Sequence, residues 1–552
     1  MHNLNRVLSF VQKTQKFFII FVIFPFISSG EHEMSENLRM QESAATMSKT
    51  AQLLNEAVNK GSRDKNHEQS WTDYWGSSYY RWNNSKPVWT DGFLPNNHAV
   101  SLIELVSNAY NYGLFPEKLN AARLLELEKA LESETSIERL YTLRTQYEIT
   151  ASGTALKFIS QLNRGIIATD TLFHRYPQNG DPLKHCRYFL FESLTSVDFK
   201  NHILKAQPRN KPYETLQVAL QNWLARVELS NTAISLNEEN MRPSLCNALN
   251  YHGYRISEEE TDSIRISNII KNFQRGHSLT VNGLFTDETK NALQRSNYNN
   301  FLQVAINLER LKTHRIPLTG ELVFVNIPSY QVKIIRHGKI EKMFKAVVGK
   351  PVTPTPEITS KIEKIVTCPK WYVPKSIATR EMLYRMKKDS MYLEKRNFRL
   401  LDHGFNEVAY SELDWSNMNA TNFNYKIMQQ PGGSNALGKL KFLFPNPHSV
   451  YLHDTPAKRY FKKDARAYSH GCVRLDQPEQ FADYLLSEIV KREDVPPVNQ
   501  FIRNGQTHEI QLEHPVDIAI RYLTCEADEH DNLIFLKDIY QKDQPIIEQI
   551  LN

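Results

Sequence analysis

The spacing of hydrophobic residues along this 552-residue chain changes near Pro317. Before Pro317, apolar residues recur three and four positions apart, as in the segment 99–113, and this pattern predicts amphipathic helices. After Pro317 they alternate with polar residues, as in ELVFVN at 321–326, and this pattern predicts strands that bury one face. A chain of this length needs more than one core. The sequence therefore predicts a multidomain α+β protein.

The composition is that of a globular protein, with 41% hydrophobic and 23% charged residues, so disorder is not expected for most of the chain. The net charge is +6, from 67 basic and 61 acidic residues. This excess is too small for the basic stripe of a nucleic-acid-binding protein, and no nucleic-acid partner is expected. A mild positive charge suits work near an anionic polymer or a membrane.

The first thirty residues carry three basic residues and no acidic one. An apolar run follows at 17–27 that is too short to span a bilayer comfortably. Small residues at Ser28 and Gly30 then suit a cleavage site. This order predicts a secretory signal peptide over 1–30, and the alternative is an uncleaved N-terminal anchor. Both place the rest of the chain outside the cytoplasm, with no membrane contact other than that anchor.

The helical half divides into several segments. Residues 31–95 are polar with interleaved aromatic residues, and we expect an irregular linker and lead-in there. Residues 96–235 repeat the helical pattern without a polar cluster that would indicate chemistry, so they predict an all-α scaffold domain. Residues 236–296 hold short helical patterns separated by glycine turns, which predicts a small three-helix domain. The segment 297–316 predicts one more scaffold helix.

The β half spans residues 317–545. Several alternating segments predict strands, and His337-Gly338 predicts a tight hairpin turn between two of them. Residues 375–433 have few strand signals and predict a helical insert. A helix is expected after Cys472, and further strands are expected near the C-terminus. We therefore expect a mostly β domain that a helical subdomain interrupts.

The cysteines are odd in number and far apart in the sequence. No CxxC pair occurs, so the chain is neither a disulfide-dense scaffold nor a zinc ribbon. In an exported protein at least one thiol then stays free or pairs between chains. The five are Cys186, Cys246, Cys368, Cys472 and Cys525.

Cys472 has unusual surroundings, because it lies in AYSHGCVRLD (467–476), between a predicted strand and a predicted helix. At such a junction the turn exposes the sulfur, and the N-terminal amides of a helix favour an anion. Backbone N–H groups of Gly471 and Cys472 would also stabilise an oxyanion. Gly471 has no Cβ, so a substrate can approach closely.

A thiol nucleophile needs a base. His453 lies nineteen residues upstream of Cys472 and His470 lies two residues before it, and the residues alone leave open which of them serves. A buried structural cysteine and a metal ligand are the alternatives for Cys472. No HExxH or CxxC pattern supports a metal site, and no metal is expected.

The segments HDTP (453–456) and SHGCVRL (469–475) resemble the signature of the L,D-transpeptidase catalytic domain, the YkuD-like fold. Beyond this motif, most of residues 90–545 resembles the large YcbB-type branch of that family. That branch combines a signal or anchor, a helical scaffold, an inserted peptidoglycan-binding domain, and a catalytic domain with a capping subdomain. Further matching segments include VFVNIPSYQVKII, VVGKPVTPTPEITSKI, WYVPKSIATREML, NALGKLKFLFPNP and DIYQKD.

The three-helix segment 236–296 in turn resembles the small peptidoglycan-binding domain. The matching residues are Gly253-Tyr254, Phe273-Gln274, Asn282-Gly283-Leu284, Thr289 and Leu293. An ordinary helical hairpin with common caps is the alternative. The resemblance implies that this segment concentrates the catalytic domain at the polymer.

The family resemblance implies a role for each residue of the motif. It makes Cys472 the nucleophile and His453 the base, oriented by Asp454 or by a nearby backbone carbonyl. It places Gly471 at the oxyanion site and Tyr451 beside it. Ser469 and His470 would be supporting residues that shape the loop. Arg474 would hold the loop, meet a substrate carboxylate or form a structural salt bridge. Trp371 would lie near the donor groove, where it could bind substrate, or in the core. The insert 375–433 would be a mobile lid.

The reaction that the resemblance implies is acyl transfer through a Cys472 thioester, without a cofactor. A tetrapeptide stem of peptidoglycan would be the donor, D-alanine would leave, and a 3→3 cross-link would form. Stem peptides and glycan strands are the implied partners, carbapenems the implied inhibitors, and the periplasm or cell envelope the implied location. The alternatives are a carboxypeptidase, a relative that anchors or cleaves lipoproteins, and a catalytically silent wall-binding scaffold.

Overall fold

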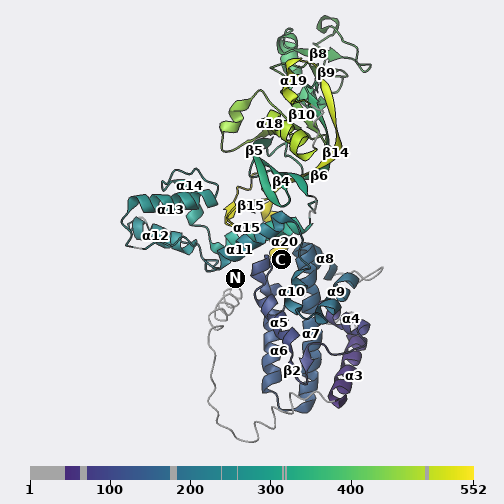
Figure 1. The fold of residues 1–552 in the computed structure, drawn as a ribbon, viewed down its shortest axis with the longest axis vertical. Helices are drawn as coiled ribbons and strands as arrows, with labels where there is room; N and C mark the ends of the chain where they lie inside the picture. The colour runs from purple at the N-terminus through teal and green to yellow at the C-terminus, as the bar shows by residue number, and fades with distance from the viewer. Residues whose placement is uncertain are drawn as a thin grey trace. The chain divides into compact units, whose positions relative to one another are not determined.

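The chain folds into two compact units, seen in a computed structural model (Figure 1). Unit 1 is Met1–Arg315 with Cys525–Phe535 and Lys542–Asn552, and unit 2 is Ile316–Thr524 with Leu536–Gln541. The structure describes residues 44–61, 71–173, 183–237, 239–257, 259–313, 316–317, 320–490 and 496–552. The predicted signal peptide or anchor over 1–30 lies outside these residues. Within the described ranges, none of the helices has the length and apolar character needed to cross a membrane.

Unit 1 is mostly helical. Helices α5, α6 and α7 lie side by side, with the 28-residue α7 packed against both of the others (Figure 1). The helices are α3 (Ala44–Gly61), α4 (Trp71–Trp82), α5 (Asn97–Ser107), α6 (Ala121–Ser133), α7 (Ile137–Arg164), α8 (Ile166–Phe173), α9 (Lys184–Leu194), α10 (Phe199–Leu204), α11 (Lys211–Leu224), α12 (Met241–Tyr251), α13 (Ser263–Gly276), α14 (Asp287–Leu293), α15 (Asn297–Thr313) and α20 (Asp543–Leu551). The prediction of a helical N-terminal part is confirmed.

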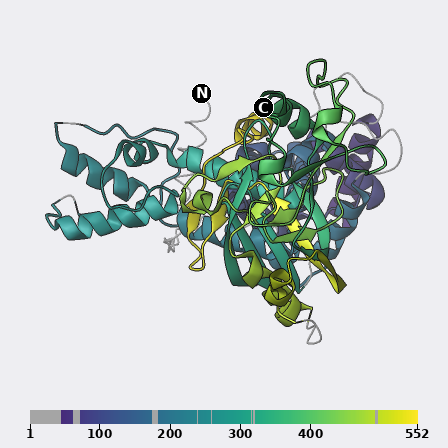
Figure 2. The ribbon, with the colours of Figure 1, turned by 90° about the horizontal axis from the view of Figure 1, so that it is seen from above.

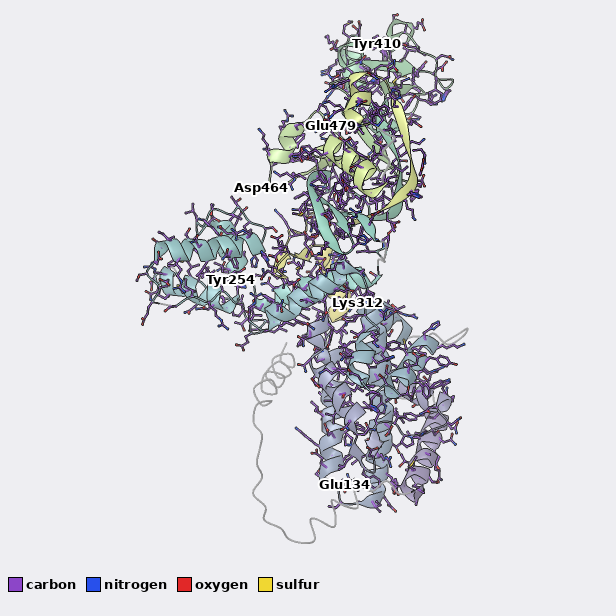
Figure 3. The ribbon with its side chains drawn as sticks, in the orientation of Figure 1. Glu134, Tyr254, Lys312, Tyr410, Asp464 and Glu479 are labelled. Carbon is purple, nitrogen blue, oxygen red and sulfur yellow. The ribbon has the colours of Figure 1, made fainter. Side chains whose placement is uncertain are left out.

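Helix α15 runs through the interior of unit 1. It contacts α7, α11 and α20, and nearly all its side chains are buried. Lys312 lies on α15 and is labelled in Figure 3. Because its ammonium is buried, its pKa is lowered to about 8. The segment predicted as a scaffold helix over 297–316 therefore lies within the helical unit.

The lead-in predicted as irregular over 31–95 is largely helical where the structure describes it. Helices α3 and α4 precede a short hairpin of β1 (Thr90–Asp91) and β2 (Leu94–Pro95). Their aromatic side chains, which the sequence analysis took for irregular chain, are core residues: Trp75, Tyr79, Tyr80 and Trp89 are all buried. Helices α4 and α7 approach so closely that a Cβ on Gly76 would lie 1.9 Å from the Ile149 carbonyl oxygen.

The segment 236–296 folds as three helices around its own core. Helices α12 and α13 lie side by side in both views of the ribbon (Figure 2). The amide of Gln274 organises the turn after α13: its nitrogen donates to the Leu284 carbonyl at 2.9 Å, and its oxygen accepts the N–H of Gly283 at 2.9 Å. Phe273 and Leu293 are fully buried. The quoted motif residues therefore build the fold of this segment.

Unit 2 is built on a sheet of strand order β12-β5-β13-β11-β10-β6-β14-β3-β4, and an additional β4–β5 pairing closes the sheet on itself. His337 and Gly338 have φ of 48° and 77°, as a tight hairpin turn between β4 and β5 requires. The strands are β3 (Glu321–Asn326), β4 (Gln331–Arg336), β5 (Lys339–Gly349), β6 (Ile358–Thr367), β10 (Leu440–Leu443), β11 (Leu452–His453), β12 (Ala467–Ser469), β13 (Val473–Leu475) and β14 (His508–Arg521). The mostly β C-terminal domain is confirmed.

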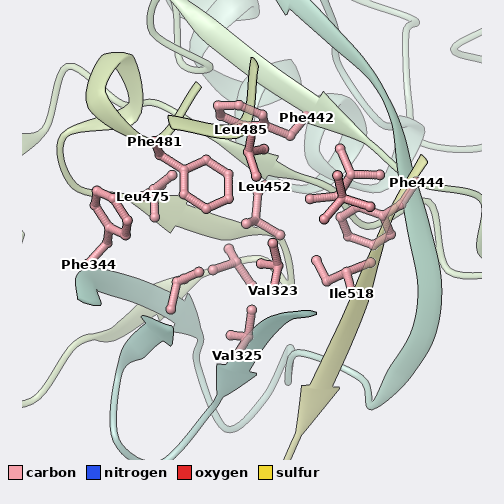
Figure 4. Packing of buried hydrophobic residues seen from close by; sticks show 14 of the residues in the cluster. Val323, Val325, Phe344, Phe442, Phe444, Leu452, Leu475, Phe481, Leu485 and Ile518 are labelled. Atoms are coloured by element: carbon pink, nitrogen blue, oxygen red, sulfur yellow. The ribbon is translucent and has the colours of Figure 1, made fainter. Parts of the chain in front are cut away.

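Alternating apolar residues of these strands fill a single core. Helix α18 (Pro478–Tyr484), the π-helical turn η7 (Leu485–Ile489) and α19 (Val498–Arg503) lie against it. Phe481 of α18 packs edge-to-face on Phe344 and Phe442, with ring centroids 5.3 and 5.0 Å apart (Figure 4). This helix follows the predicted active-site segment, so its packing anchors that segment to the sheet.

The insert in unit 2 is not only helical, as predicted for 375–433. It contains a three-stranded sheet of order β7-β9-β8, formed by β7 (Trp371–Tyr372), β8 (Phe398–Leu401) and β9 (Lys426–Gln429). The short helical elements α16 (Lys375–Ile377), η3 (Ala378–Met382) and α17 (Leu383–Lys388) share a core with this sheet. The alternation of apolar residues did not indicate the strands of this sheet, because none of them exceeds four residues.

The C-terminal end of the predicted domain 317–545 also departs from the prediction. Strands β15 (Cys525–Ala527) and β16 (Leu533–Phe535) pair with each other and belong to unit 1, as does α20. Phe535 packs on Trp223 of α11, and Asp543 pairs with Arg310 of α15 at 2.8 Å. Alternation predicted these strands correctly, but it carries no information about the core that they join.

Candidate active site

Cys472 lies in the turn between β12 and β13. It does not precede a helix directly, as the sequence analysis expected: β13 intervenes, and α18 begins only at Pro478. The amides of a helix N-terminus are therefore not available to the sulfur. The residue is half-buried, and none of the five cysteines forms a disulfide.

A network of hydrogen bonds holds the backbone of this turn. The Thr355 hydroxyl donates to the Gly471 carbonyl at 2.8 Å and accepts the Gly349 N–H at 2.9 Å. The Tyr540 hydroxyl donates to the Gly349 carbonyl at 2.6 Å and accepts the Thr355 N–H at 3.1 Å. Thr355 is fully buried. Two segments distant in sequence thus hold the Cys472 turn in one conformation.

Gly471 is required by backbone conformation. Its φ of +118° lies in the region that favours glycine, whereas a Cβ would find its nearest neighbour at an ordinary 3.6 Å. Its N–H donates to the Ser469 hydroxyl at 3.1 Å, and that hydroxyl donates to the Cys472 carbonyl. The Gly471 N–H thus points into the turn, contrary to the oxyanion role expected for it. The Cys472 N–H has no hydrogen-bond partner among the described residues.

The strand register places the histidine and the cysteine on one face of the sheet. Strands β11 and β13 are parallel, with His453 opposite Arg474. Side chains two positions apart in a strand share a face, so Tyr451 and His453 lie on the face that holds Arg474 and Cys472. On the other side of β11, Lys441 of β10 is opposite His453. His453 therefore lies between two cationic residues.

The hydrogen bond of the His453 ring fixes its tautomer. Nδ1 lies 2.5 Å from the backbone carbonyl oxygen of Asp454, and because a carbonyl only accepts, Nδ1 carries the proton. Burial, and then the positive charges of Arg474 and Lys441, lower the pKa of His453 to about 3. The imidazole is therefore neutral near pH 7, and its Nε2 lone pair is available to accept a proton.

The Asp454 carboxylate does not orient His453. One oxygen accepts the Lys439 N–H at 2.8 Å and the other pairs with the Lys458 ammonium at 2.7 Å. A Cβ on Gly438 would lie 2.2 Å from this carboxylate. Of the two orienting groups that the sequence analysis allowed, the structure places the backbone carbonyl at the ring, and the carboxylate braces the neighbouring turn.

The Cys472 sulfur is near groups that favour its anion. Tyr451 acts to lower the pKa of the Cys472 thiol as a hydrogen-bond donor through its backbone and its side chain, and Trp371 acts in the same direction on the Tyr451 hydroxyl. Burial nevertheless raises the pKa of the Cys472 thiol, although these donors and the charges of Lys441 and Arg474 act in the opposite direction. The resting site therefore holds a neutral thiol and a neutral imidazole.

His470 is turned away from this cluster. Its Nε2 lies 2.6 Å from a carboxylate oxygen of Glu381 in the insert, and both side chains are partly exposed. Of the two histidines left open by spacing, the register thus places His453 on the sheet face that holds Cys472. His470 instead joins the Cys472 turn to the insert.

Arg474 lies on the same face as Cys472, but no carboxylate of a described residue pairs with it. Its guanidinium lies 6.0 Å from the centre of the Tyr460 ring, and its buried Nε has no hydrogen-bond partner among the described residues. The structural salt bridge considered for Arg474 is therefore not formed within the described part of the chain. The remaining expectations are that Arg474 holds the loop or meets a substrate carboxylate.

Four residues of this site were not singled out from the sequence: Thr355, Tyr540, Glu381 and Lys441. Thr355 and Tyr540 occur in the segments VVGKPVTPTPEITSKI and DIYQKD that resemble the family, which was the available signal. Lys441 alternates with the buried Leu440 and Phe442, but alternation does not say what its face contacts. For Glu381 the sequence offers no signal.

Two family models match parts of the chain. Residues 320–507 match the model of the L,D-transpeptidase catalytic domain, YkuD. This segment is therefore similar to that catalytic domain. Residues 76–220 match a model described as a scaffold domain. The matched residues 320–507 include Lys441, His453, Cys472 and Arg474.

Two individual proteins resemble the chain. A protein of Haemophilus influenzae named "Putative L,D-transpeptidase" is 33% identical over 244 residues, which are 44% of this chain and 48% of that protein. The chain thus matches about half the length of this curated relative. A solved L,D-transpeptidase from Mycobacterium smegmatis is 15% identical, covers 37% of this chain and 58% of its own, and has a TM-score of 0.17.

Proposed function

We propose that this protein is a peptidoglycan L,D-transpeptidase that forms 3→3 cross-links through a thioester on Cys472. The observation that carries this proposal is the neutral His453, with its proton held on Nδ1, on the same sheet face as Cys472. An uncharged base beside an uncharged thiol suits general-base activation of the thiol at the moment of attack.

In the first half-reaction the Cys472 sulfur attacks the carbonyl carbon of the third residue of a tetrapeptide stem. His453 Nε2 takes the thiol proton as the sulfur–carbon bond forms. The carbon–nitrogen bond to the terminal D-alanine then breaks, and His453 returns the proton to the leaving amine. The products are a thioester and free D-alanine, so the proton count balances. No cofactor takes part.

In the second half-reaction the side-chain amine of a second stem attacks the thioester. His453 takes a proton from this amine and returns it to the departing sulfur, which restores the thiol. Water would give a tripeptide instead, so exclusion of water decides the outcome. We propose that the insert acts as a lid for this purpose.

The oxyanion formed in both steps needs a donor. We assign this role to the Cys472 N–H, because the Gly471 N–H is already bonded to Ser469. Ser469, Thr355 and Tyr540 hold the turn in which this N–H lies. The Tyr451 hydroxyl, supported by Trp371, would stabilise the sulfur whenever it carries negative charge.

The remaining assignments follow from the same proposal. The three-helix segment 236–296 would bind peptidoglycan glycan strands, and carbapenems would acylate Cys472. The protein would act in the cell envelope after export. Its partners would be stem peptides and glycan strands.

Mass spectrometry of purified protein mixed with disaccharide-tetrapeptide tests the proposal. We expect 3→3 dimers, released D-alanine and a carbapenem adduct on Cys472, and no products with Cys472→Ala. Tripeptide without dimer would identify a carboxypeptidase instead. An inactive protein that still sediments with peptidoglycan would identify a wall-binding scaffold.

A further inference from the structure

Lys441 is a half-buried cation without an anionic partner. Its ammonium makes no hydrogen bond or ion pair with a described residue. The carboxylate that acts on it most, that of Glu509, is already paired with Lys364 at 2.7 Å. A charge that is held partly out of water without a partner is costly, and such charges cluster at functional sites.

The position of Lys441 in the sheet determines which groups its ammonium lies near. The residue is opposite His453 in the β10–β11 ladder, and its ammonium lies 4.0 Å from the centre of the Tyr451 ring. Tyr451 in turn acts to lower the pKa of the Cys472 thiol, as does the charge of Lys441 itself. Lys441 therefore presents a positive charge on the sheet face of the nucleophile, on the side of His453 opposite Arg474.

The donor stem of the proposed reaction carries an anion at a matching place. Its scissile amide joins the third residue to a terminal D-alanine, whose carboxylate carbon lies within about 4 Å of the attacked carbonyl carbon. A donor bound with that carbonyl at Cys472 must therefore bring a carboxylate close to the sulfur. A stem with a fifth residue would carry a neutral amide there instead.

We propose that Lys441 binds the terminal carboxylate of the donor stem and thereby selects stems that end at the fourth residue. This inference rests on the proposed function and adds a specificity-determining residue to it. An ammonium that loses its water gains strongly from a carboxylate and little from an amide. Arg474 then remains for another anionic group of the substrate.

The test compares two donors, disaccharide-tetrapeptide and the same molecule with a C-terminal carboxamide. Acylation of Cys472 is followed by intact-protein mass spectrometry in wild type, Lys441→Met and Lys441→Arg. We expect wild type to prefer the acid by about 10- to 100-fold, the range of one charge-assisted hydrogen bond. Lys441→Met should lose this preference, and Lys441→Arg should keep most of it.

Lys439→Met is the matched control, because Lys439 is two residues away and its ammonium pairs with Glu479 at 3.0 Å. Glu479 is labelled in Figure 3. This control should keep the wild-type preference. A Lys441→Met protein that still prefers the acid overturns the inference. The inference is also overturned if Lys441→Met lowers acylation by both donors equally and lowers iodoacetamide reactivity to the same extent. That result would mean that Lys441 only activates the thiol. A wild type that neither donor acylates overturns the proposed function itself.

Discussion

At the scale of single residues, the candidate site keeps its base neutral by burying it and by placing it between two cations. His453 has Lys441 on one side and Arg474 on the other, and its Nδ1 proton is held by a carbonyl. A carboxylate at Nδ1 would instead favour the imidazolium. The resting pair is therefore a thiol and an imidazole, and negative charge arises on sulfur only when a substrate is attacked.

This resting state predicts the pH dependence of Cys472 alkylation. Since burial raises the pKa of the thiol, the thiolate fraction is small near neutral pH and continues to grow through the ordinary thiol range. The rate with iodoacetamide should therefore keep rising from about pH 6 to about pH 10. Peptide mass spectrometry of Cys472 gives the rate at each pH. A plateau below about pH 7 would mean a preformed thiolate–imidazolium pair.

The same assay separates the two histidines. His453→Ala should lower both the alkylation rate near neutral pH and the acylation by a tetrapeptide donor, because the base is gone. His470→Ala should keep much of both, since its ring bonds to Glu381. If alkylation and acylation fell equally in the two variants, His453 could not be distinguished as the base from His470 as a supporting residue.

The hydroxyl of Thr355 gives a third prediction at this scale. Thr355→Val keeps the shape of the side chain but leaves the Gly471 carbonyl and the Gly349 N–H without this partner. A buried group left unsatisfied costs about 1–3 kcal/mol, and we expect this loss in thermal unfolding together with slower acylation. Thr379→Val, whose hydroxyl bonds Lys375 in an exposed turn, is the control. Unchanged acylation in Thr355→Val would show that the turn does not need this support.

The sequence identified the chemistry of the site better than its geometry. The motif gave Cys472 and His453 as a candidate pair. It could not show that the Gly471 N–H points inward or that the Asp454 carboxylate braces a turn, because both depend on backbone conformation and distant partners. Lys441 was not visible for the same reason: only the register of β10 against β11 brings it to His453.

At the scale of elements, the insert is joined to the Cys472 turn by the His470–Glu381 hydrogen bond. Both side chains are partly exposed, 32% for His470 and 48% for Glu381, so water and salt weaken the bond. A contact of this strength suits a segment that must open and close, because it favours closure without locking it.

Removing this contact gives the prediction for the insert. Glu381→Gln should change global stability by less than about 1 kcal/mol. Hydrogen exchange should nevertheless quicken in residues 378–388, and the tripeptide-to-dimer ratio should rise because water enters more often. Glu412→Gln, elsewhere in the insert, is the control for loss of charge. A large fall in thermal stability would instead make the contact part of the core.

Short elements were also where the sequence failed. The His337-Gly338 turn was predictable because both residues tolerate positive φ, and the long helices were predictable from their period. The helices of the lead-in were missed because their buried aromatic residues follow no simple spacing. The strands of the insert are too short to alternate visibly.

At the scale of the whole molecule, the chain passes between the two units four times, after Arg315, Thr524, Phe535 and Gln541. Its last residues therefore serve both units: Phe535 and Asp543 pack in unit 1, and Tyr540 bonds within unit 2. The sequence could place the catalytic domain but not these crossings, because periodicity describes local structure and not the core that a segment joins.

Two C-terminal truncations test this arrangement by hydrogen exchange. Ending the chain after Gln541 removes Asp543, the carboxylate partner of the buried Arg310, and loss of one partner of such a pair costs about 3–5 kcal/mol. Exchange should quicken in α15 while the Cys472 turn stays protected by Tyr540. Ending it after Thr524 also removes Phe535 and Tyr540, so protection should fall in α11 and in residues 349–355 and 467–475 as well. If the longer truncation left 349–355 protected, the C-terminal segment would not hold the Cys472 turn.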